Sequence, residues 1–435
     1  MIAKKIKSRE RDAIIQALSA GVVPRIGIQH IAVGRSKETD AMIKDIEKIA
    51  NKASAIRFII GEYGAGKTFF LNLVRQISLE KQLVVVSADL APDRRIHATA
   101  GQARNLYSEL MRNLSTRSKP DGGALQSIIE RFISDTSRKA KKEEVNVSEA
   151  IHSKLLPLEE FVAGFDFATV LEAYWKRFND GDDMLKGHAL RWLRGEYSTK
   201  TEARKDLGLR SIIDDASVYD HLKLMARFVQ IAGYAGLMVT LDEMVNLYKL
   251  NNAQARNANY EQLLRIINDV LQGTSSGIGF VFGGTSDFLM DTRRGIYSYE
   301  ALQSRLAENQ FAKNNLVDLS GPVVRLQSLK PEEFYILLAN IRHVFALGNE
   351  SDYLIPDKAL EAFMVYCNEK IGEAYFRTPR STAKAFVNLL AVLEQNPTAT
   401  WDMLIADTAI EADKPVDKNI PEDIESDEEL ATFKL

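Results

Sequence analysis

The chain has 435 residues with 46% hydrophobic and 26% charged side chains, and its formal net charge is -3. This length suits two or three folded modules, and the charge argues against a protein dominated by neutralisation of nucleic-acid phosphates, although local basic patches stay compatible with it. The single cysteine, Cys367, excludes an internal disulfide framework and a cysteine-rich zinc site, and it suggests a reducing compartment.

The N-terminal stretch MIAKKIKSRERDAIIQAL predicts an amphipathic helix, because it is charged and lacks the apolar core of a secretion signal. No apolar run of the sequence approaches the length of a membrane span. We therefore expect a cytoplasmic protein with no membrane partner.

A glycine-rich turn between a strand and a helix is the most informative motif of the chain. Residues 56–60, IRFII, are typical of a buried strand, and FFLNLVRQISLEK after the turn has helical core spacing. The turn GEYGAGKT matches the pattern GxxxxGK[ST], in which backbone N–H groups and the positive helix end hold a polyphosphate. Lys67 would neutralise the β- and γ-phosphates and Thr68 would ligate Mg²⁺, whereas the plain alternative is a strand–turn–helix connection with a surface lysine. The predicted nucleotide-binding residues of this Walker A motif, or P-loop, are Gly61, Glu62, Tyr63, Gly64, Ala65, Gly66, Lys67, Thr68 and Phe69.

The next apolar run, LVVVSADL at 83–90, predicts a second strand of the sheet. The strand that must supply a metal-positioning acid comes much later, so we expect an inserted helical module at 113–225. Within it, His188, Arg191, Trp192 and Arg194 form a basic and aromatic cluster. Such a cluster could contact DNA, RNA or a partner protein, but it is more often the packed face of a helix.

A strand at 237–241 ends in two acids, Asp242 and Glu243. A P-loop needs an acid on a neighbouring strand, so Asp242 would hold the Mg²⁺ shell. Glu243 would orient and deprotonate the attacking water. The alternative is an acidic pair that caps the following helix.

The sequence GIGFVFGGTSDF at 277–288 predicts a further strand, and GPVVRLQSL at 321–329 predicts the strand that closes the core. In ATPases whose sheet has an extra strand between the P-loop strand and the acidic strand, a polar residue after that strand senses the γ-phosphate. Thr285 is the first candidate for this sensor and Ser286 the second. Plain turn chemistry is the alternative.

The motifs GEYGAGKT, VTLDEM and FVFGGTSDF, the last followed by RRGIYSYEALQSRL, resemble those of the BrxD-like ATP-binding proteins of bacterial phage-defence islands of the BREX type. The motifs also resemble those of the wider AAA+ superfamily, in particular its origin-recognition-like branch. The resemblance covers the chain from about residue 35 to about residue 395. It implies an α/β fold with a parallel AAA+/ASCE-type P-loop sheet flanked by helices, and ATP and Mg²⁺ as cofactors. In the family pattern the segment VGR lies against the adenine, which implies a nucleotide-side role for Gly34 and Arg35. An ordinary loop before a helix is the alternative.

Three predicted amphipathic helices near the C-terminus resemble the helical lid of AAA+ proteins. Their sequences are LKPEEFYILLANIRHVFAL, IPDKALEAFMVYCNEKIG and TPRSTAKAFVNLLAVLEQ. The resemblance implies that Arg380, at the start of the third helix, presents its guanidinium to the γ-phosphate. Arg377 could take that role instead.

AAA+ proteins also have an arginine that completes the site of a neighbouring subunit, and the resemblance places it just after the sensor strand. Arg305 is the first candidate, with Arg293 and Arg294 as alternatives. The plain interpretation of Arg305 is a helix-surface residue paired with Glu300 or Glu308.

The segment after the last predicted helix is short and acidic, so we expect no winged-helix DNA-binding domain there. The expected organisation is an N-terminal helical segment with the adenine-side loop, two parts of the ATPase core around the helical insertion, a helical lid and an acidic tail. The corresponding boundaries are 1–50, 51–112, 113–225, 226–329, 330–412 and 413–435.

The sequence therefore predicts an AAA+-type ATP hydrolase that couples ATP binding and hydrolysis to assembly or remodelling of a larger complex, with DNA-associated antiviral defence as its setting. The expected partners are ATP, further copies of the chain or other defence-system proteins, and DNA as a candidate ligand. The alternative is a nucleotide-gated interaction protein that uses ATP as a structural switch with little hydrolysis. A DNA translocase or helicase acting alone is a third hypothesis, weakened by the charge and the absent winged helix.

Overall fold

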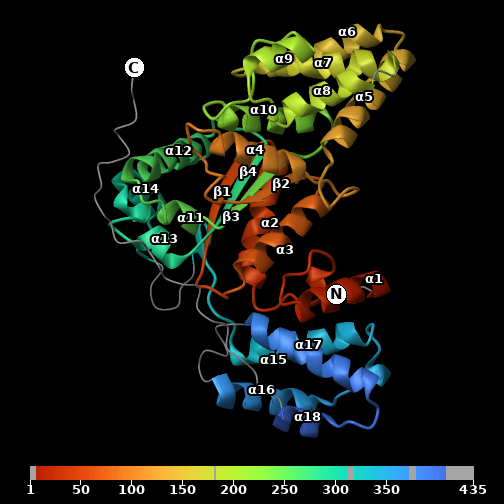
Figure 1. Ribbon diagram of the computed structural model, residues 1–435, viewed down its shortest axis with the longest axis vertical. Coiled ribbons are helices and arrows are strands. Elements are labelled where there is room, and N and C mark those ends of the chain that lie inside the picture. The colour runs from red at the N-terminus through yellow and green to blue at the C-terminus, as the bar shows by residue number, and fades with distance from the viewer. Residues whose placement is uncertain (1–5, 181–182, 312–317, 372–378, 408–435) are drawn as a thin grey trace.

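The computed structural model describes residues 6–180, 183–311, 318–371 and 379–407, and its centre is a five-stranded parallel sheet (Figure 1). The spatial order of the strands is β2-β3-β4-β1-β5, and every neighbouring pair is parallel. The strands are β1 (Ser54–Ile60), β2 (Val84–Asp89), β3 (Leu237–Asp242), β4 (Ile278–Gly284) and β5 (Val323–Arg325).

All five predicted strands are present, and β4 lies between β1 and β3 as the sequence predicted. The prediction for the last strand was too long, since β5 covers only three residues of 321–329. Parallel pairing places the carboxyl ends of β1, β2, β3 and β4 at one edge of the sheet, where the P-loop and the predicted acids follow.

Two layers of helices cover the sheet, because alternate residues of each strand point to opposite faces. Ile59 of β1 packs with apolar residues of α2 (Ser36–Ala50) and α3 (Lys67–Glu80). Phe58 packs on the other face, in the cluster that includes α4 (Gln102–Arg112), α10 (Val218–Ile231) and α12 (Ala253–Leu271).

A group of helices extends from the second layer, away from the C-terminal helices (Figure 1). They are α5 (Leu125–Lys142), α6 (Val147–Glu159), α7 (Gly164–Asp180), α8 (Asp183–Leu193) and α9 (Lys200–Leu207). Their apolar residues belong to the same core as those of α4 and α10, and Ser115 pairs with Val85 of β2. The helices between 113 and 225 therefore share a core with the sheet layer, and residue 225 lies inside α10.

A second, separate core lies among the C-terminal helices α15 (Pro331–Phe345), α16 (Asp357–Ile371), α17 (Pro379–Gln395) and α18 (Trp401–Asp407). The N-terminal helix α1 (Ser8–Ser19) packs on α17 and α15 and contributes the buried Ile14. The two ends of the described chain thus share one core. Cys367 lies fully buried in it, and burial raises the pKa of its thiol to about 12, which is consistent with the predicted core residue.

Short elements complete the chain. They are the 3₁₀ turns η1 (Ile28–His30), η2 (Ile296–Ser298) and η3 (Glu350–Asp352), and the helices α11 (Val245–Tyr248), α13 (Ser286–Met290) and α14 (Glu300–Leu306). In the described part of the chain, each helix is too short or too polar to span a bilayer.

Candidate functional site

The predicted P-loop connects β1 to α3 at the carboxyl edge of the sheet. Gly64 and Gly66 have φ angles of 83° and 82°, a conformation that side chains with a Cβ rarely adopt. Gly66 is the N-cap of α3, a helix of 14 residues, so the N–H groups of its first turn face the loop. This backbone geometry suits a bound polyphosphate.

The Lys67 side chain folds back over the loop. Its Nζ donates hydrogen bonds to the carbonyl oxygens of Gly61 at 2.8 Å and Glu62 at 3.0 Å. Burial lowers the pKa of the Lys67 amine, while the carboxylates of Asp242, Glu243 and Glu62 act in the opposite direction. The amine is thus held at the loop, close to Asp242 at the end of β3 and to Glu243 after it.

Thr68 and Asp242 meet across the strand ends. The Thr68 hydroxyl donates to Oδ2 of Asp242 at 2.9 Å, and Oδ1 of Asp242 accepts the N–H of Glu243 at 2.9 Å. A Cβ on Gly283 of β4 would collide with the Asp242 carboxylate, so a glycine is needed there. The hydroxyl and the carboxylate supply oxygen ligands of the kind that Mg²⁺ prefers, and they fit the predicted metal position.

Glu243 has a left-handed backbone with φ 56°, which is uncommon for a residue with a side chain. Partial burial raises the pKa of its carboxyl, and the neighbouring Asp242 and Asp89 raise it further. The side chain itself reaches the surface. A carboxyl in this position can accept a proton more readily than an ordinary surface glutamate.

Asp89 is a third acid at this edge that the sequence analysis did not assign to the site. It lies in register with Asp242 on the neighbouring strand, and burial and Asp242 raise the pKa of its carboxyl. The apolar run 83–90 was predicted as a strand and contains Asp89 next to its end, but the position of this acid beside β3 depends on the strand order. Among the described residues, no group of three or more His, Cys, Asp or Glu side chains has the geometry of an all-protein metal site.

The predicted sensor Thr285 lies at the end of β4, beside the start of the P-loop, where the Gly61 N–H donates to the Gly284 carbonyl at 3.2 Å. Its Oγ1 accepts the N–H of Phe288 at 3.3 Å, so Thr285 is the N-cap of α13 and Ser286 is the first residue of that helix. The turn chemistry considered as the alternative is therefore present. It leaves the hydroxyl hydrogen of Thr285 as a donor.

Gly34 and Arg35 lie between the P-loop and the C-terminal helices. The Arg35 guanidinium donates to the carbonyl oxygens of Ala65, at 3.3 Å, and of Gln327, and burial lowers its pKa. Gly34 has φ 66°, and a Cβ there would collide with the Glu333 carboxylate at the start of α15. The two residues thus join the P-loop to α15.

The arginines predicted to act on phosphate have contacts within the chain. Arg305 donates from Nε to Oδ1 of Asn268 at 2.5 Å and from Nη1 to the carbonyl of Ala301 at 2.8 Å. Neither Glu300 nor Glu308 is its partner in the ion pairs of the described chain, and Glu308 pairs with Arg325.

The alternative arginines differ in exposure. Arg293 is exposed, whereas Arg294 is buried and donates to the Leu250 carbonyl at 3.2 Å. Arg380 donates from Nε to the carbonyl of Gly21, at the end of α1. Arg377 lies outside the described residues.

In the basic and aromatic cluster predicted at 188–194, Trp192 is packed in the core, which was the alternative considered for it, while His188, Arg191 and Arg194 are half-buried. Trp192 is 1% exposed and donates from Nε1 to the Ser211 carbonyl at 3.0 Å. Arg191 pairs with Glu202 at 2.6 Å and stacks over the Tyr197 ring at 4.3 Å. The indole is therefore not available for stacking on bases.

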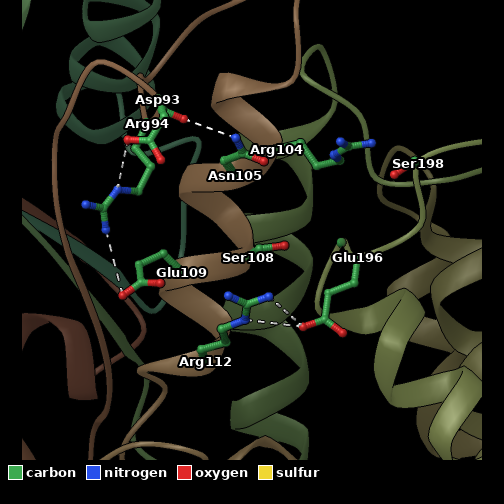
Figure 2. Close-up of a pocket in the computed structure, with 10 residues that line it drawn as sticks. Asp93, Arg94, Arg104, Asn105, Ser108, Glu109, Arg112, Glu196 and Ser198 are labelled. Carbon is green, nitrogen blue, oxygen red and sulfur yellow. Dashed lines mark hydrogen bonds and ion pairs between the residues drawn. The ribbon is translucent and has the colours of Figure 1, made fainter.

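A polar cavity of about 350 Å³ lies between α4, the loop after β2 and the segment after α8 (Figure 2). Figure 2 shows Arg112 of α4 directed at Glu196, and the shortest distance between their ionic groups is 3.3 Å. Arg94 approaches Glu109 at 3.8 Å from the loop. No P-loop residue lines this cavity, which lies where α4 meets the segment between α8 and α9.

A family model described as "BREX system ATP-binding protein BrxC/D" matches residues 6–409. No curated protein matches the chain.

Proposed function

Because this chain belongs to the BrxC/D family of BREX system ATP-binding proteins, we propose that it is an AAA+-type, Mg²⁺-dependent ATPase. In this proposal, ATP binding and hydrolysis drive assembly or remodelling of a larger phage-defence complex. The observation that carries the proposal is the contact of Thr68 with Asp242 beside the folded-back Lys67.

Different groups at the P-loop would bind the phosphates, the metal ion and the adenine side of the nucleotide. The N–H groups from Gly61 to Thr68 and the start of α3 bind the phosphates, and Lys67 exchanges its loop carbonyls for phosphate oxygens. Thr68 and Asp242 would hold Mg²⁺, which would neutralise developing charge on the phosphates. Gly34 and Arg35 support the loop from the adenine side, with Arg35 acting through the Ala65 carbonyl.

Glu243 is the proposed base for the attacking water. Its raised pKa and its place directly after Asp242 suit a group that orients water and takes a proton. Thr285 would donate its hydroxyl hydrogen to the γ-phosphate or to the water. Arg380 and Arg305 remain proposed contributors, in the same chain and across a subunit boundary, and DNA remains a proposed partner of the assembly.

Nucleotide binding and turnover by the purified protein test the proposal. Lys67→Ala should abolish ATP binding, whereas Lys81→Ala, just after the other end of α3, should behave as wild type because Lys81 lies on the surface and pairs with Glu47 there. Glu243→Gln should keep ATP binding and lower turnover by about 10²- to 10⁴-fold, as expected when a general base is lost.

The same measurements separate the proposal from a nucleotide-gated switch. A nucleotide-gated switch would bind ATP through Lys67 but would hydrolyse it little or not at all. The Glu243→Gln variant would then have no wild-type turnover to lower. Equal turnover by Glu243→Gln and wild type would mean that the acidic pair is misassigned. The mass of the protein without nucleotide, with ADP and with ATP would show whether nucleotide controls its assembly.

A further inference from the structure

Asn246 stands one turn after Glu243, in α11, and its side-chain amide makes two contacts. Nδ2 donates to the Leu90 carbonyl at 2.8 Å and to the Glu243 carbonyl at 3.2 Å. One amide thus ties the backbone of the proposed base to the first residue after β2.

Glu243 needs such a tie because its backbone is in the left-handed region, with φ 56°. The N–H of Asn246 also donates to the Glu243 carbonyl, at 3.0 Å, so both donors of one residue hold that carbonyl. On the other side of Glu243, the Met244 N–H donates to the Gly283 carbonyl at 3.0 Å. The backbone around Glu243 is therefore held by Asn246 on one side and by β4 on the other.

Leu90 is a firm anchor for the other hydrogen bond of Asn246. The Leu90 N–H donates to the Asp242 carbonyl at 3.0 Å, and its side chain is 2% exposed. The loop that follows is closed by two backbone hydrogen bonds between Ala91 and Arg94, of 3.0 and 3.1 Å. The segment that receives the amide of Asn246 is thus itself held in place.

The same loop is anchored at its far end. The N–H groups of Gly101 and Arg104 both donate to the Asp215 carboxylate, at 2.7 and 2.8 Å. Asn105 of α4 donates from Nδ2 to the Asp93 carbonyl at 3.2 Å, a contact drawn in Figure 2. Asn246 and Asn105 therefore donate to carbonyls at opposite ends of residues 90–93. Of these two asparagines, only Asn246 contacts Glu243.

We propose that Asn246 is a positioning residue for Glu243: its amide holds the strained backbone of the base against the Leu90 carbonyl, so that the carboxylate faces the attacking water. This inference rests on the proposed function, since it takes Glu243 as the base. Asn246 has no contact with the P-loop among its hydrogen bonds in the described structure, so ATP binding should not depend on it.

Two substitutions separate positioning from packing. Asn246→Asp keeps the shape of the side chain but replaces its donors with a carboxylate that repels both carbonyls, whereas Asn246→Ala only removes the contacts. A positioning role predicts that Asn246→Asp lowers kcat by at least about tenfold relative to wild type, and by more than Asn246→Ala does. It also predicts that the ATP dissociation constant of Asn246→Asp changes less than about threefold. A packing role predicts the opposite order, because Ala leaves a gap and Asp does not.

Asn105→Asp is the matched control, since it makes the same isosteric change on the same loop without touching Glu243. It should leave kcat and ATP affinity as in wild type. If Asn246→Asp keeps wild-type kcat, or if Asn105→Asp lowers kcat as much, the proposal is wrong.

A second measurement does not need hydrolysis. Amide hydrogen exchange around residues 90–94 and 243–247 should be faster in Asn246→Asp than in wild type, with the rest of the sheet unchanged. Unaltered exchange there would overturn the positioning role. Failure of the proposed function would give a different result. Glu243→Gln would then have the same ATP turnover as wild type, while Asn246→Asp would still show faster amide exchange than wild type.

Discussion

The Thr68 hydroxyl donates a hydrogen bond to Oδ2 of Asp242 at 2.9 Å, joining two residues that are 174 positions apart in the chain. The contact places the two proposed Mg²⁺ ligands side by side. Thr68→Val keeps the shape of the side chain and removes its ligand oxygen. We expect nearly normal ATP binding without Mg²⁺ and at least a tenfold loss of the extra affinity that Mg²⁺ confers, measured by ATP titration with Mg²⁺ and with EDTA.

Asp242→Asn should give a similar loss, and the double variant should lose little more than either single variant because both act on one ion. Unchanged Mg²⁺ dependence in both single variants would contradict the assignment of this pair.

Local patterns were enough to predict the glycine-rich turn between β1 and α3, the five strands and the closeness of Thr68 and Asp242. The prediction worked because a glycine-rich turn and a strand ending in acid are signals of a few residues each, and parallel strands end at one edge. It did not extend to Asp89, whose place beside Asp242 depends on the order of the strands.

Contacts between distant segments could not be predicted in this way. The apolar spacing of α1 predicts a helix but not that it packs on α17. Likewise, the charge and aromatic content of α8 cannot tell a binding surface from a packed one, because the partners of Trp192 and Arg191 come from 197–211. The helix of Arg305 was predicted, but its partner Asn268 belongs to another helix.

Arg305 provides a test of subunit communication. An Arg305→Ala chain with an intact P-loop, mixed with a Lys67→Ala chain with an intact Arg305, should recover turnover that neither variant shows alone. The reason is that an arginine supplied from a neighbouring subunit stabilises charge on the transferred phosphoryl group, an effect of about 10³-fold or more. Turnover and the mass of the mixed assembly are the measurements.

Asn268→Ala controls for a structural role of Arg305. If Arg305 only fastens α14 to α12, Asn268→Ala should reproduce the defect of Arg305→Ala, and mixed assemblies should show no recovery. Arg293→Ala, at the exposed alternative, should be examined in the same mixtures and should leave turnover unchanged.

A buried ion pair fixes α2 to the sheet. Asp45 of α2 and Arg57 of β1 are 2% and 5% exposed, and Oδ2 of Asp45 lies 2.5 Å from Nε of Arg57. Asp45→Ala leaves the buried Arg57 charge without its carboxylate, with only the Leu319 and Gly321 carbonyls to accept from it, and we expect a loss of about 3–5 kcal/mol in the free energy of unfolding. Urea unfolding measures it. Asp45→Ala combined with Arg57→Met should be more stable than Asp45→Ala alone, and a less stable double variant would contradict this account.

His221 makes the stability of the junction between α4, α8 and α10 depend on pH. It is 1% exposed, its ring contacts those of Tyr107 and Trp192, and its Nδ1 lies 2.8 Å from the Ser217 carbonyl. Because that carbonyl can only accept, Nδ1 carries the proton, and the buried Nε2 has no hydrogen-bond partner among the residues that the structure describes.

Burial lowers the pKa of His221 below its usual 6.5, against the opposing effects of the Ser217 carbonyl and of the nearby carboxylates of Asp220, Asp214 and Asp166. Below pH 6.5 the unfolded chain therefore takes up a proton that the folded chain resists. The free energy of unfolding should fall as the pH decreases from 6.5, by at most about 1.4 kcal/mol per pH unit from this residue.

His221→Asn keeps a donor near Nδ1 and removes the titration. Urea unfolding at pH 5.5, 6.5 and 7.5 should show a smaller loss of stability toward acid in this variant than in wild type, whatever its stability at pH 7.5. The comparison of slopes isolates one proton, since every other titrating group is common to both proteins. Parallel curves for the two proteins would show that His221 takes up its proton equally in the folded and unfolded states, contrary to its burial.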